Sequence, residues 1–496
     1  MNRYKILDKK NNIFATIFIL LIVGSIYFIR QNYWNNHPPY SPDINAVLLA
    51  AGNNRSQFEK VLEYYSRNPS DSLKLRAAEF LIVNMPGKYA VEYEAPFEDI
   101  IAGYVHWNER ESQQEVDRVF KLGEPVIKED IKHITADYLM NNIELSFKVW
   151  NEQPWGKNVP FDVFCEEILP YRIANEPLEN WREKVLVNFS KLNRTFKQQP
   201  ELTAVEACIR VNLQLPKLKL SNQPLPSMNY SMIMTALRGT CKEMTALTVF
   251  TMRALGIPVT REWTPKWPRR NVGHLWNSVY DGSGHVGRQI SFMGTEAIPG
   301  ISHHGARMPK SKVYRLTYAR QNNINAKNVD VPPQLNYSCM KDVTEEYVAA
   351  FPFYKKEQNP VSNILPKKGF SFIHDSVYKR GKGIVLDPLP EKGAGVEIPV
   401  KYPSTHHNGY IWLATTGVNE WNITGWGETD TKTIRFGSIG REILHLPVYY
   451  ENGLQTPANY PFWVDDKNHV QIFEPDTAHL RKLPVSKIAS FDSTYI

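Results

Sequence analysis

Apolar residues recur at helical spacing through the first two hundred residues of the chain. The segment SDSLKLRAAEFLIVNMPG (70–87) begins with a Ser/Asp pair that suits a helix start, continues as an apolar stripe and ends at Pro-Gly. The segment KEDIKHITADYLMNNIELSFKVWNE (128–152) carries the same kind of stripe and predicts another helix. These patterns predict a helical region over residues 46–184, in which the stripes form a core.

The pattern changes after Pro216, where a helical segment is followed by strand-like segments. Apolar and polar residues alternate as in antiparallel strands in HLWNSVYDG (274–282), GHVGRQISFMG (284–294) and SKVYRLTYAR (311–320). A helix followed by antiparallel strands is typical of an α+β fold rather than of a doubly wound sheet. We therefore expect an α+β core over residues 185–330.

Short strand-like runs dominate the last third of the chain. Glycine and proline punctuate them, and the pairs Asn408-Gly409 and Asn452-Gly453 are typical of tight turns between strands. The pattern predicts a β-rich C-terminal domain over residues 345–496, organised as a β-sandwich or a barrel-like module.

The amino terminus carries an uncharged apolar run, Ile13–Ile29, which spans about 26 Å as a helix at ~1.5 Å per residue. Basic residues precede it, and they keep the first residues in the cytoplasm and direct the remaining chain outward. Residues 1–30 are therefore predicted to be a signal anchor or a signal peptide, followed by a polar linker over 31–45. We favour an uncleaved membrane anchor with extracytoplasmic domains; cleavage near Gly24-Ser25 would instead give a secreted or periplasmic protein.

Composition narrows the class of protein. The chain has 496 residues, 42% of them hydrophobic and 22% charged, which suits two or three globular domains. Its net charge of +7 is spread along the chain rather than gathered in a basic block, so we expect no nucleic-acid partner. The four cysteines are too few and too scattered for a disulfide scaffold or a Cys-x-x-Cys zinc site, and we expect no metal and no cofactor.

One cysteine stands at the start of a predicted helix. The stretch RGTCKEMTALTVFTMRALGIP (238–258) places Cys241 in the first turn, with Gly256 and Pro258 as stop signals. Free backbone N–H groups and the positive end of the helix dipole stabilise a thiolate there, so the pattern predicts a lowered pKa for the Cys241 thiol. The same N–H groups can also stabilise an oxyanion.

A thiolate nucleophile needs a partner that accepts and returns a proton near neutral pH, and histidine suits both tasks. His274 opens the next predicted strand downstream, where alternation places it on one face with Trp276 and Ser278. A thiol on a helix that packs against this sheet can meet the imidazole. Spacing alone leaves open the alternative of a buried thiol and an ordinary histidine on a polar face.

The segment RGTCKEMTALTVFTMRALGIPVTREWTPKWPRRNVGHLWNSVYDGSG (238–284) resembles the transglutaminase-like superfamily, whose members carry a helix-starting Cys, an ALGIP step and a following H-x-W strand. The segment FCEEILPYRIANEPLENWR (164–182) and the β-rich tail are similar to multidomain transglutaminase-like proteins of Bacteroidetes, so the resemblance covers most of the chain. It implies a transglutaminase-like (papain-like) core with Cys241 as the nucleophile and His274 as general base and acid.

The chain departs from the family pattern at one position. The family places an aspartate on the strand after the His strand to orient the imidazole, but that strand here reads HVGRQISFMGTE (285–296) and has none. Gln289, Ser291 or Met293 falls near the place. Asp281 lies at the preceding turn, where an ordinary turn-forming role is the alternative. We expect a polar substitute or a backbone carbonyl to orient the imidazole, or else a catalytically weak site.

Three tryptophans lie close to this Cys–His motif in the sequence. Trp263, Trp267 and Trp276 are candidates for lining a cleft that receives a peptide or a sugar, with ordinary packing as the alternative.

These observations together predict an exported, thiol-dependent amide or peptide hydrolase or acyl transferase that works through a thioester. The resemblance implies that hydrolysis is common in bacterial members, and the expected substrate is a peptide, protein or glycopeptide outside the cytoplasm. The alternative is a catalytically inactive transglutaminase-like protein that binds an extracytoplasmic glycan or peptide. The missing aspartate favours binding, whereas the retained Cys and His favour catalysis.

Overall fold

The structure is a computed structural model of the chain. It describes residues 24–25, 40–101, 125–221, 226–282, 289–295, 297–299, 309–321, 330–348, 355–356, 384–385, 395–404, 409–465 and 469–474.

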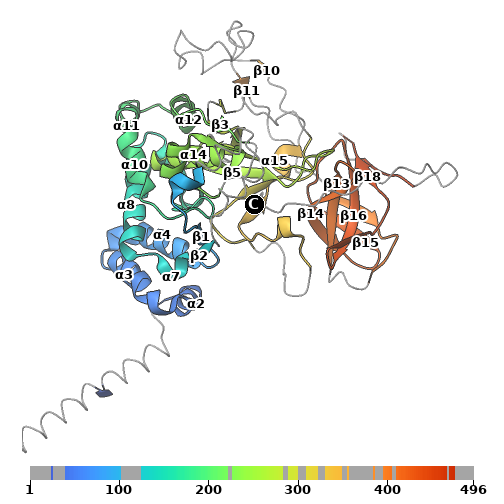
Figure 1. Ribbon diagram of the computed structural model, residues 1–496, viewed down its shortest axis with the longest axis horizontal. Coiled ribbons are helices and arrows are strands. Elements are labelled where there is room, and N and C mark those ends of the chain that lie inside the picture. Colours follow the sequence, from blue (N-terminus) through green and yellow to red (C-terminus); the bar gives the residue numbers. More distant parts are fainter. Residues whose placement is uncertain are drawn as a thin grey trace, which may run out of the picture.

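The described residues form a helical part, a central sheet with its own helix, and a C-terminal sheet. In Figure 1 the labelled helices from α2 to α14 lie to the left, the labelled strands β13 to β18 lie to the right, and β5 lies between them. This mixture of helices and antiparallel strands is consistent with the α+β fold that the sequence predicts.

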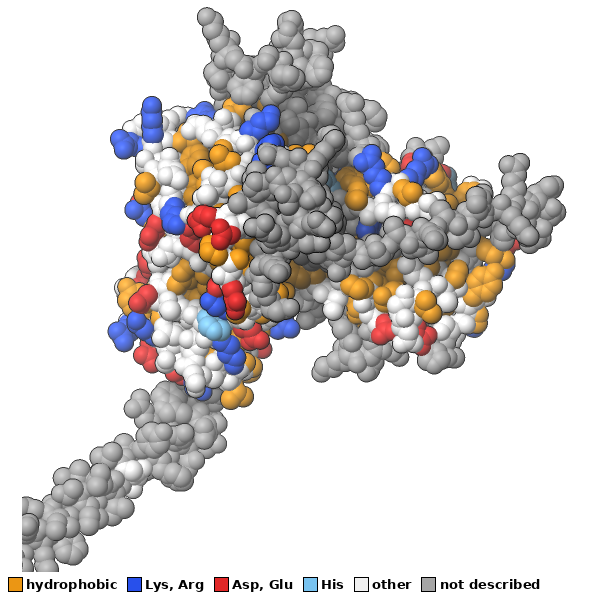
Figure 2. Space-filling view, in the orientation of Figure 1, with side chains coloured by type: hydrophobic (Ala, Val, Ile, Leu, Met, Phe, Trp, Pro, Cys, Tyr) orange, Lys and Arg blue, Asp and Glu red, His pale blue; other side chains and the backbone are white. Residues whose placement is uncertain are grey.

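The helical part contains short helices joined by tight turns. On the face shown in Figure 2, acidic and basic side chains are intermixed over it. The bounds are α2 Pro42–Ala51, α3 Arg55–Ser66, α4 Ser72–Val83, α7 Asp130–His133, α8 Ala136–Glu152, α9 Phe161–Glu167, α10 Trp181–Asn188, α11 Ser190–Lys197, α12 Ala204–Asn212 and α13 Tyr230–Ala236. The 3-10 turns are η1 Gly52–Asn54, η2 Pro69–Asp71 and η3 Gly156–Asn158, and an antiparallel pair joins β1 Tyr89–Glu92 to β2 Val126–Glu129.

The helical stripe predicted over residues 128–152 is divided between α7 and α8. Ile134 has extended backbone angles, and the hydroxyl of Thr135 accepts a hydrogen bond from the backbone N–H of Tyr138. Thr135 therefore acts as an N-cap and starts a new helix inside the apolar pattern.

The central sheet has the strand order β7-β6-β5-β8-β9, and all of its neighbouring strands are antiparallel. Helix α14, Cys241–Ala254, packs against β5 and β6. The strands are β5 Val259–Thr264, β6 His274–Tyr280, β7 Gln289–Phe292, β8 Tyr314–Leu316 and β9 Met340–Asp342. Small elements nearby are β3 Lys219–Leu220, β4 Arg238–Gly239, η5 Pro333–Leu335, α15 Glu345–Val348, β10 Lys355–Lys356 and β11 Ile384–Val385.

The C-terminal residues form one curved antiparallel sheet with the order β12-β15-β14-β13-β16-β18-β19, to which β17 adds at β16 (Figure 1). Asn452 and Gly453 both have positive φ and form the predicted tight turn between β16 and β17, whereas Asn408 lies outside the described residues. The strands are β12 Val396–Pro399, β13 Tyr410–Thr416, β14 Trp421–Thr429, β15 Thr433–Phe436, β16 Ile443–Glu451, β17 Leu454–Pro457, β18 Phe462–Val464 and β19 Val470–Ile472.

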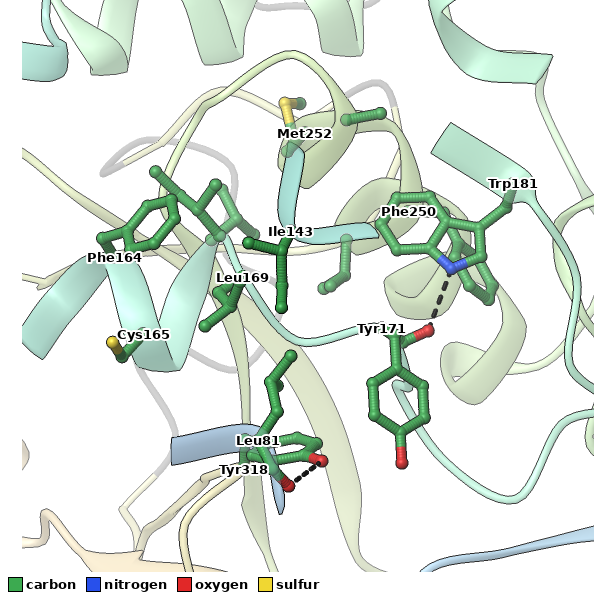
Figure 3. Packing of buried hydrophobic residues seen from close by; sticks show 14 of the residues in the cluster. Leu81, Ile143, Phe164, Cys165, Leu169, Tyr171, Trp181, Phe250, Met252 and Tyr318 are labelled. Atoms are coloured by element: carbon green, nitrogen blue, oxygen red, sulfur yellow. Dashed lines mark hydrogen bonds between the residues drawn. The ribbon is translucent and has the colours of Figure 1, made fainter. Parts of the chain in front are cut away.

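One hydrophobic cluster runs from Ile44 in α2 to Tyr318 after β8, so the helical part and α14 share a core. Figure 3 shows part of it, where polar atoms of buried aromatic residues are paired. The indole N–H of Trp181 donates to the carbonyl of Tyr171, and the hydroxyl of Tyr318 donates to the carbonyl of Leu81. This shared core fixes α14 against the helical part.

The apolar run predicted to be a membrane anchor lies, apart from Gly24 and Ser25, outside the described residues. Among the helices that the structure describes, none combines the length and the apolar character needed to cross a membrane.

Candidate functional site

Helix α14 begins at the predicted cysteine because a capping box fixes its first turn. The hydroxyl of Thr240 accepts a hydrogen bond from the backbone N–H of Lys242 at 3.2 Å. The Glu243 carboxylate accepts one from the backbone N–H of Thr240 at 2.8 Å. These reciprocal bonds satisfy helix N–H groups that would otherwise lack partners and set where the helix starts. Cys241 is the first residue of the helix, as predicted.

The other end of α14 also follows the sequence signals. Gly256 has φ +75°, and the backbone N–H of Ile257 donates to the carbonyl of Met252. This is the left-handed termination that glycine favours. A side chain also ties the helix to the sheet, because the amide of Asn277 on β6 donates to the carbonyl of Thr245 at 3.2 Å.

The structure brings the Cys241 thiol to Leu275, the second residue of β6. The backbone N–H of Leu275 donates a hydrogen bond to the sulfur, and Leu275 directly follows His274. The backbone N–H groups of Cys241 and Lys242 also donate to the sulfur, and all three donors lower the pKa of the thiol. Three N–H donors from a helix start and a strand start therefore converge on this sulfur, an arrangement that stabilises negative charge.

The pKa predicted for Cys241 is wrong in direction. Burial of the thiol raises its pKa, and the N–H donors of Leu275, Cys241 and Lys242 lower it by less. Burial disfavours the charged thiolate because the protein interior replaces water around the sulfur. The expected stabilising groups are thus present, but an isolated thiol here is mainly protonated at neutral pH.

His274 lies among aromatic rings on one face of the central sheet. Its ring centroid is 6.0 Å from that of Trp267 and 6.2 Å from that of Trp276, and all three rings are within about 35° of parallel. The Lys310 ammonium lies 5.4 Å from the Trp267 centroid. Burial lowers the pKa of Lys310 to about 8, so this amine loses its proton more readily than an exposed lysine.

A buried carboxylate that the sequence analysis missed supports this face. Glu262 on β5 is fully buried; it accepts hydrogen bonds from the Trp276 indole at 3.2 Å, from the Tyr347 hydroxyl and from the Arg315 guanidinium at 2.6 Å. Glu262 is paired in register with Trp276, two residues from His274. It therefore positions an indole that packs beside the imidazole. The sequence carries no local signal for this role, because all six residues of VTREWT are buried and the partners of Glu262 lie far along the chain.

The residues predicted to orient His274 lie further along the strand. The ladder between β6 and β7 ends at Asn277, and Ser291 is paired with Ser278, about 13 Å along the strand from His274. Gln289 contacts the Glu167 carboxylate at 2.5 Å, and Asp281 follows the far end of β6. None of the three is brought beside His274.

Met293, the remaining position named from the sequence, follows the end of β7 and packs against two hydrophobic clusters. It is a packing residue in this structure.

The three tryptophan candidates divide between two places. Trp267 and Trp276 lie beside His274, whereas Trp263 is paired with Leu275 and packs with Tyr314 at the contact with the C-terminal sheet. All three side chains are at least nine-tenths buried. They form walls around the candidate site rather than an exposed aromatic groove.

All four cysteines are free thiols, and only Cys241 is partly exposed. Among the residues whose placement is described, no group of His, Cys, Asp and Glu could hold a metal ion.

Comparisons with known proteins give no relative for this arrangement. No protein-family model, no curated protein and no solved structure matches the chain.

Proposed function

We propose that this protein is a cysteine-dependent amide or peptide hydrolase or acyl transferase of the transglutaminase-like type. The proposal rests on one contact. The backbone N–H of Leu275, the residue after His274, donates a hydrogen bond to the sulfur of Cys241 at the capped start of α14. A nucleophile, an adjacent proton carrier and convergent N–H donors are the parts that acyl transfer requires.

The proposed reaction proceeds in two steps. The Cys241 sulfur attacks the amide carbonyl carbon, its proton passes to His274, and the N–H donors stabilise the resulting oxyanion. The C–N bond then breaks, His274 returns the proton to the departing amine, and a thioester remains. Water or an acceptor amine, deprotonated by His274, attacks the thioester and restores the thiol. Hydrolysis is the preferred outcome.

We further propose that the reaction takes place outside the cytoplasm, on a peptide, protein or glycopeptide. The support is the apolar run Ile13–Ile29 with its basic flank, a pattern typical of export and membrane anchoring. A reporter fused after residue 45 should be active only outside the cytoplasm.

A second candidate function is binding of an extracytoplasmic glycan or peptide without catalysis. Burial raises the pKa of Cys241, and Ser291, Gln289 and Asp281 lie away from His274, both of which favour this alternative.

The pH dependence of Cys241 alkylation separates the two functions. If His274 accepts the thiol proton, iodoacetamide should modify Cys241 at pH 6–7 at a rate that is nearly independent of pH, and His274→Ala should slow it at least about tenfold. The matched control is His133→Ala, which removes an exposed histidine at the end of α7. Modification is measured by mass spectrometry of the intact full-length protein and of its Cys241 peptide.

The binding function predicts a different profile. The rate should then rise about tenfold per pH unit from 7 to 9, as for a buried thiol acting alone, and should be equal in the parent and His274→Ala proteins. That result would remove His274 from the mechanism and leave binding as the preferred function.

A further inference from the structure

A cavity of about 450 Å³ lies beside the central sheet, and neither Cys241 nor His274 is among the residues that line it. Its walls are the turn at residues 86–89, the segment 170–175, the strands β5 and β8 with the residues that follow β8, and the segment 333–339. Exposed residues, among them Gly87, Asn336 and Ser338, also line it. The cavity therefore opens to the surface.

Cationic side chains dominate the charged lining. Four of them face the cavity, and no aspartate or glutamate occurs among the described residues that line it: Lys88, Arg172, Arg253 and Arg261. The three arginine side chains are all more than nine-tenths buried. Buried cations are costly unless an anion or several hydrogen bonds compensate them.

Only one of these cations has a carboxylate partner within the described structure. Arg172 forms an ion pair with Asp130. Arg253 donates only to backbone carbonyls, and Arg261 donates only to the carbonyl of Ile173. A planar guanidinium with five donors and one carbonyl partner retains most of its capacity for a carboxylate or a phosphate.

Lys88 is the third cation of the lining that lacks an acidic partner in the described structure. Its ammonium lies 3.5 Å from the Cys339 sulfur and 4.1 Å from the centroid of the Tyr318 ring. Both contacts hold the side chain in place without neutralising its charge. Burial lowers the pKa of Lys88, as expected for an amine with no carboxylate bound to it.

Two further carboxylates near the cavity are held by backbone amides and do not enter the lining. Glu166 accepts from the N–H groups of Tyr318 at 2.7 Å and Ala319 at 3.2 Å. Glu176 accepts from the N–H groups of Ile173 at 2.8 Å and Ala174 at 2.7 Å. These two carboxylates offset part of the positive charge of the lining without being part of it. The charged side chains that face the cavity are therefore all cationic.

We propose that this cavity is a binding site for a small anionic organic ligand, whose carboxylate or phosphate group is held by Arg261 and Lys88. Tyr318 and Tyr337 also line the cavity and add aromatic surface to its wall. The volume is far larger than a single phosphate needs and suits a molecule the size of an acidic dipeptide or a sugar phosphate.

The site lies close to the candidate nucleophile but does not depend on its chemistry. Arg261 is two residues from Trp263 on one face of β5, and Trp263 is paired with Leu275, whose N–H contacts Cys241. Two residues along a strand span about 7 Å. A ligand bound at Arg261 is therefore a near neighbour of Cys241, and Cys241→Ala should leave its binding unchanged.

Protection of Cys339 tests the proposal, because this free thiol lines the cavity. Full-length protein is treated with methyl methanethiosulfonate at increasing concentrations of N-acetylglutamate, of inorganic phosphate or of the neutral N-acetylglutaminamide, and the Cys339 peptide is quantified. An anion that occupies the cavity should slow modification saturably, about tenfold at nine times its Kd. Comparison of the two anions distinguishes a carboxylate from a phosphate ligand.

Substitutions of the two cationic residues test whether the anion binds in this cavity. Arg261→Gln and Lys88→Met should each raise the Kd at least about tenfold, because each removes a charge-assisted hydrogen bond in a buried setting. Arg55→Gln, which removes an exposed arginine of α3, is the matched control and should leave the Kd unchanged. Lys88 lies in a surface turn, so its variant remains informative if the buried Arg261 variant does not fold.

Three outcomes would overturn the proposal. Neither anion slows modification, the neutral amide slows it as strongly as the acid, or both cavity variants retain the parent Kd. Saturable protection by one anion that is lost in the variants supports it.

Discussion

Burial changes the acid–base chemistry of Glu167, the last residue of α9. One of its oxygens accepts a hydrogen bond from Gln289, and the other is buried with no hydrogen-bond partner in the described structure. Burial raises the pKa of this carboxyl to about 8. The folded protein therefore holds a neutral glutamic acid at pH 7.

This pKa predicts a loss of stability as the pH rises. The unfolded chain releases the Glu167 proton near pH 4.3, whereas the folded protein holds it until about pH 8, so the free energy of unfolding falls across this window. Glu167→Gln should leave stability unchanged at pH 4 and raise it by roughly 2 to 5 kcal/mol at pH 8.5. Denaturant unfolding at both values measures this.

The matched control for this prediction is Glu63→Gln, which changes an exposed glutamate of α3. It should have no comparable effect at either pH. An equal free energy of unfolding for parent and Glu167→Gln at pH 8.5 would contradict the buried neutral acid.

The sequence points to Cys241 and His274 as candidates because residue type and spacing are visible in it. It did not yield the direction of the Cys241 pKa, because that depends on how completely the rest of the chain covers the sulfur. For the same reason it could not separate Trp263 from Trp267 and Trp276, which differ only in the partners that each ring meets.

At the scale of elements, the start of α14 has a close counterpart elsewhere in the chain. Helix α12 begins with the same capping box, in which Thr203 and Glu206 take the places of Thr240 and Glu243. The two capping boxes use the same residue types, but only the box of α14 has a cysteine between its Thr and its Glu. Stability and thiol chemistry can therefore be separated by changing each box in turn.

Thr240→Ala and Thr203→Ala should each lower the free energy of unfolding by about 1 kcal/mol, since each removes an N-cap hydroxyl. Only Thr240→Ala should also change the rate of Cys241 alkylation, because it loosens the turn that holds the thiol. Denaturant unfolding and thiol labelling on the same samples check both statements. An unchanged labelling rate in Thr240→Ala would show that the cap does not position the sulfur.

Elements whose stability depends on distant contacts were the ones missed from the sequence. Strand β5, VTREWT, contains buried Arg261 and Glu262, whose charges are accommodated by partners far along the chain. Strand β14 contains Gly425 and Gly427, where a Cβ would lie 2.7 Å from the Lys312 side chain and 2.2 Å from the Arg435 carbonyl. Neither the charge partners nor the close approaches are visible in a local pattern.

At the scale of the whole molecule, the C-terminal sheet contacts the central sheet near the candidate site. The Tyr314 ring on β8 stacks on Trp426 of β14 with centroids 5.5 Å apart, and its hydroxyl donates to the carbonyl of Thr424 at 3.0 Å. Both rings belong to a cluster that also includes Trp263. The C-terminal sheet is therefore part of the wall next to Cys241 and not an independent appendage.

The C-terminal sheet makes a second contact with the loop that precedes His274. In this loop, Asn271 accepts a hydrogen bond from the backbone N–H of Val418 at 2.7 Å and donates to the Val418 carbonyl at 3.1 Å. The amide of Asn422 donates to Asn271 at 3.2 Å. Asn271 therefore helps to connect the turn between β13 and β14 to the residues before β6. The backbone N–H of Arg269, which donates to the carbonyl of Thr416, and the Asn422 amide, which also donates to the carbonyl of Arg270, connect the same segments.

Asn271→Ala should free this loop while leaving both sheets folded. The side chain is exposed, so the loss of stability should be about 1 kcal/mol, but hydrogen exchange of the backbone amides at residues 269–275 should become faster. Because the N–H of Leu275 donates to the Cys241 sulfur, faster exchange there means weaker support of the thiol. Asn141→Ala is the control, since Asn141 makes a similar exposed contact with Glu183 in the helical part. Unchanged exchange at residues 269–275 in Asn271→Ala would mean that the Asn271 side chain does not hold the residues that lead into the His274 strand.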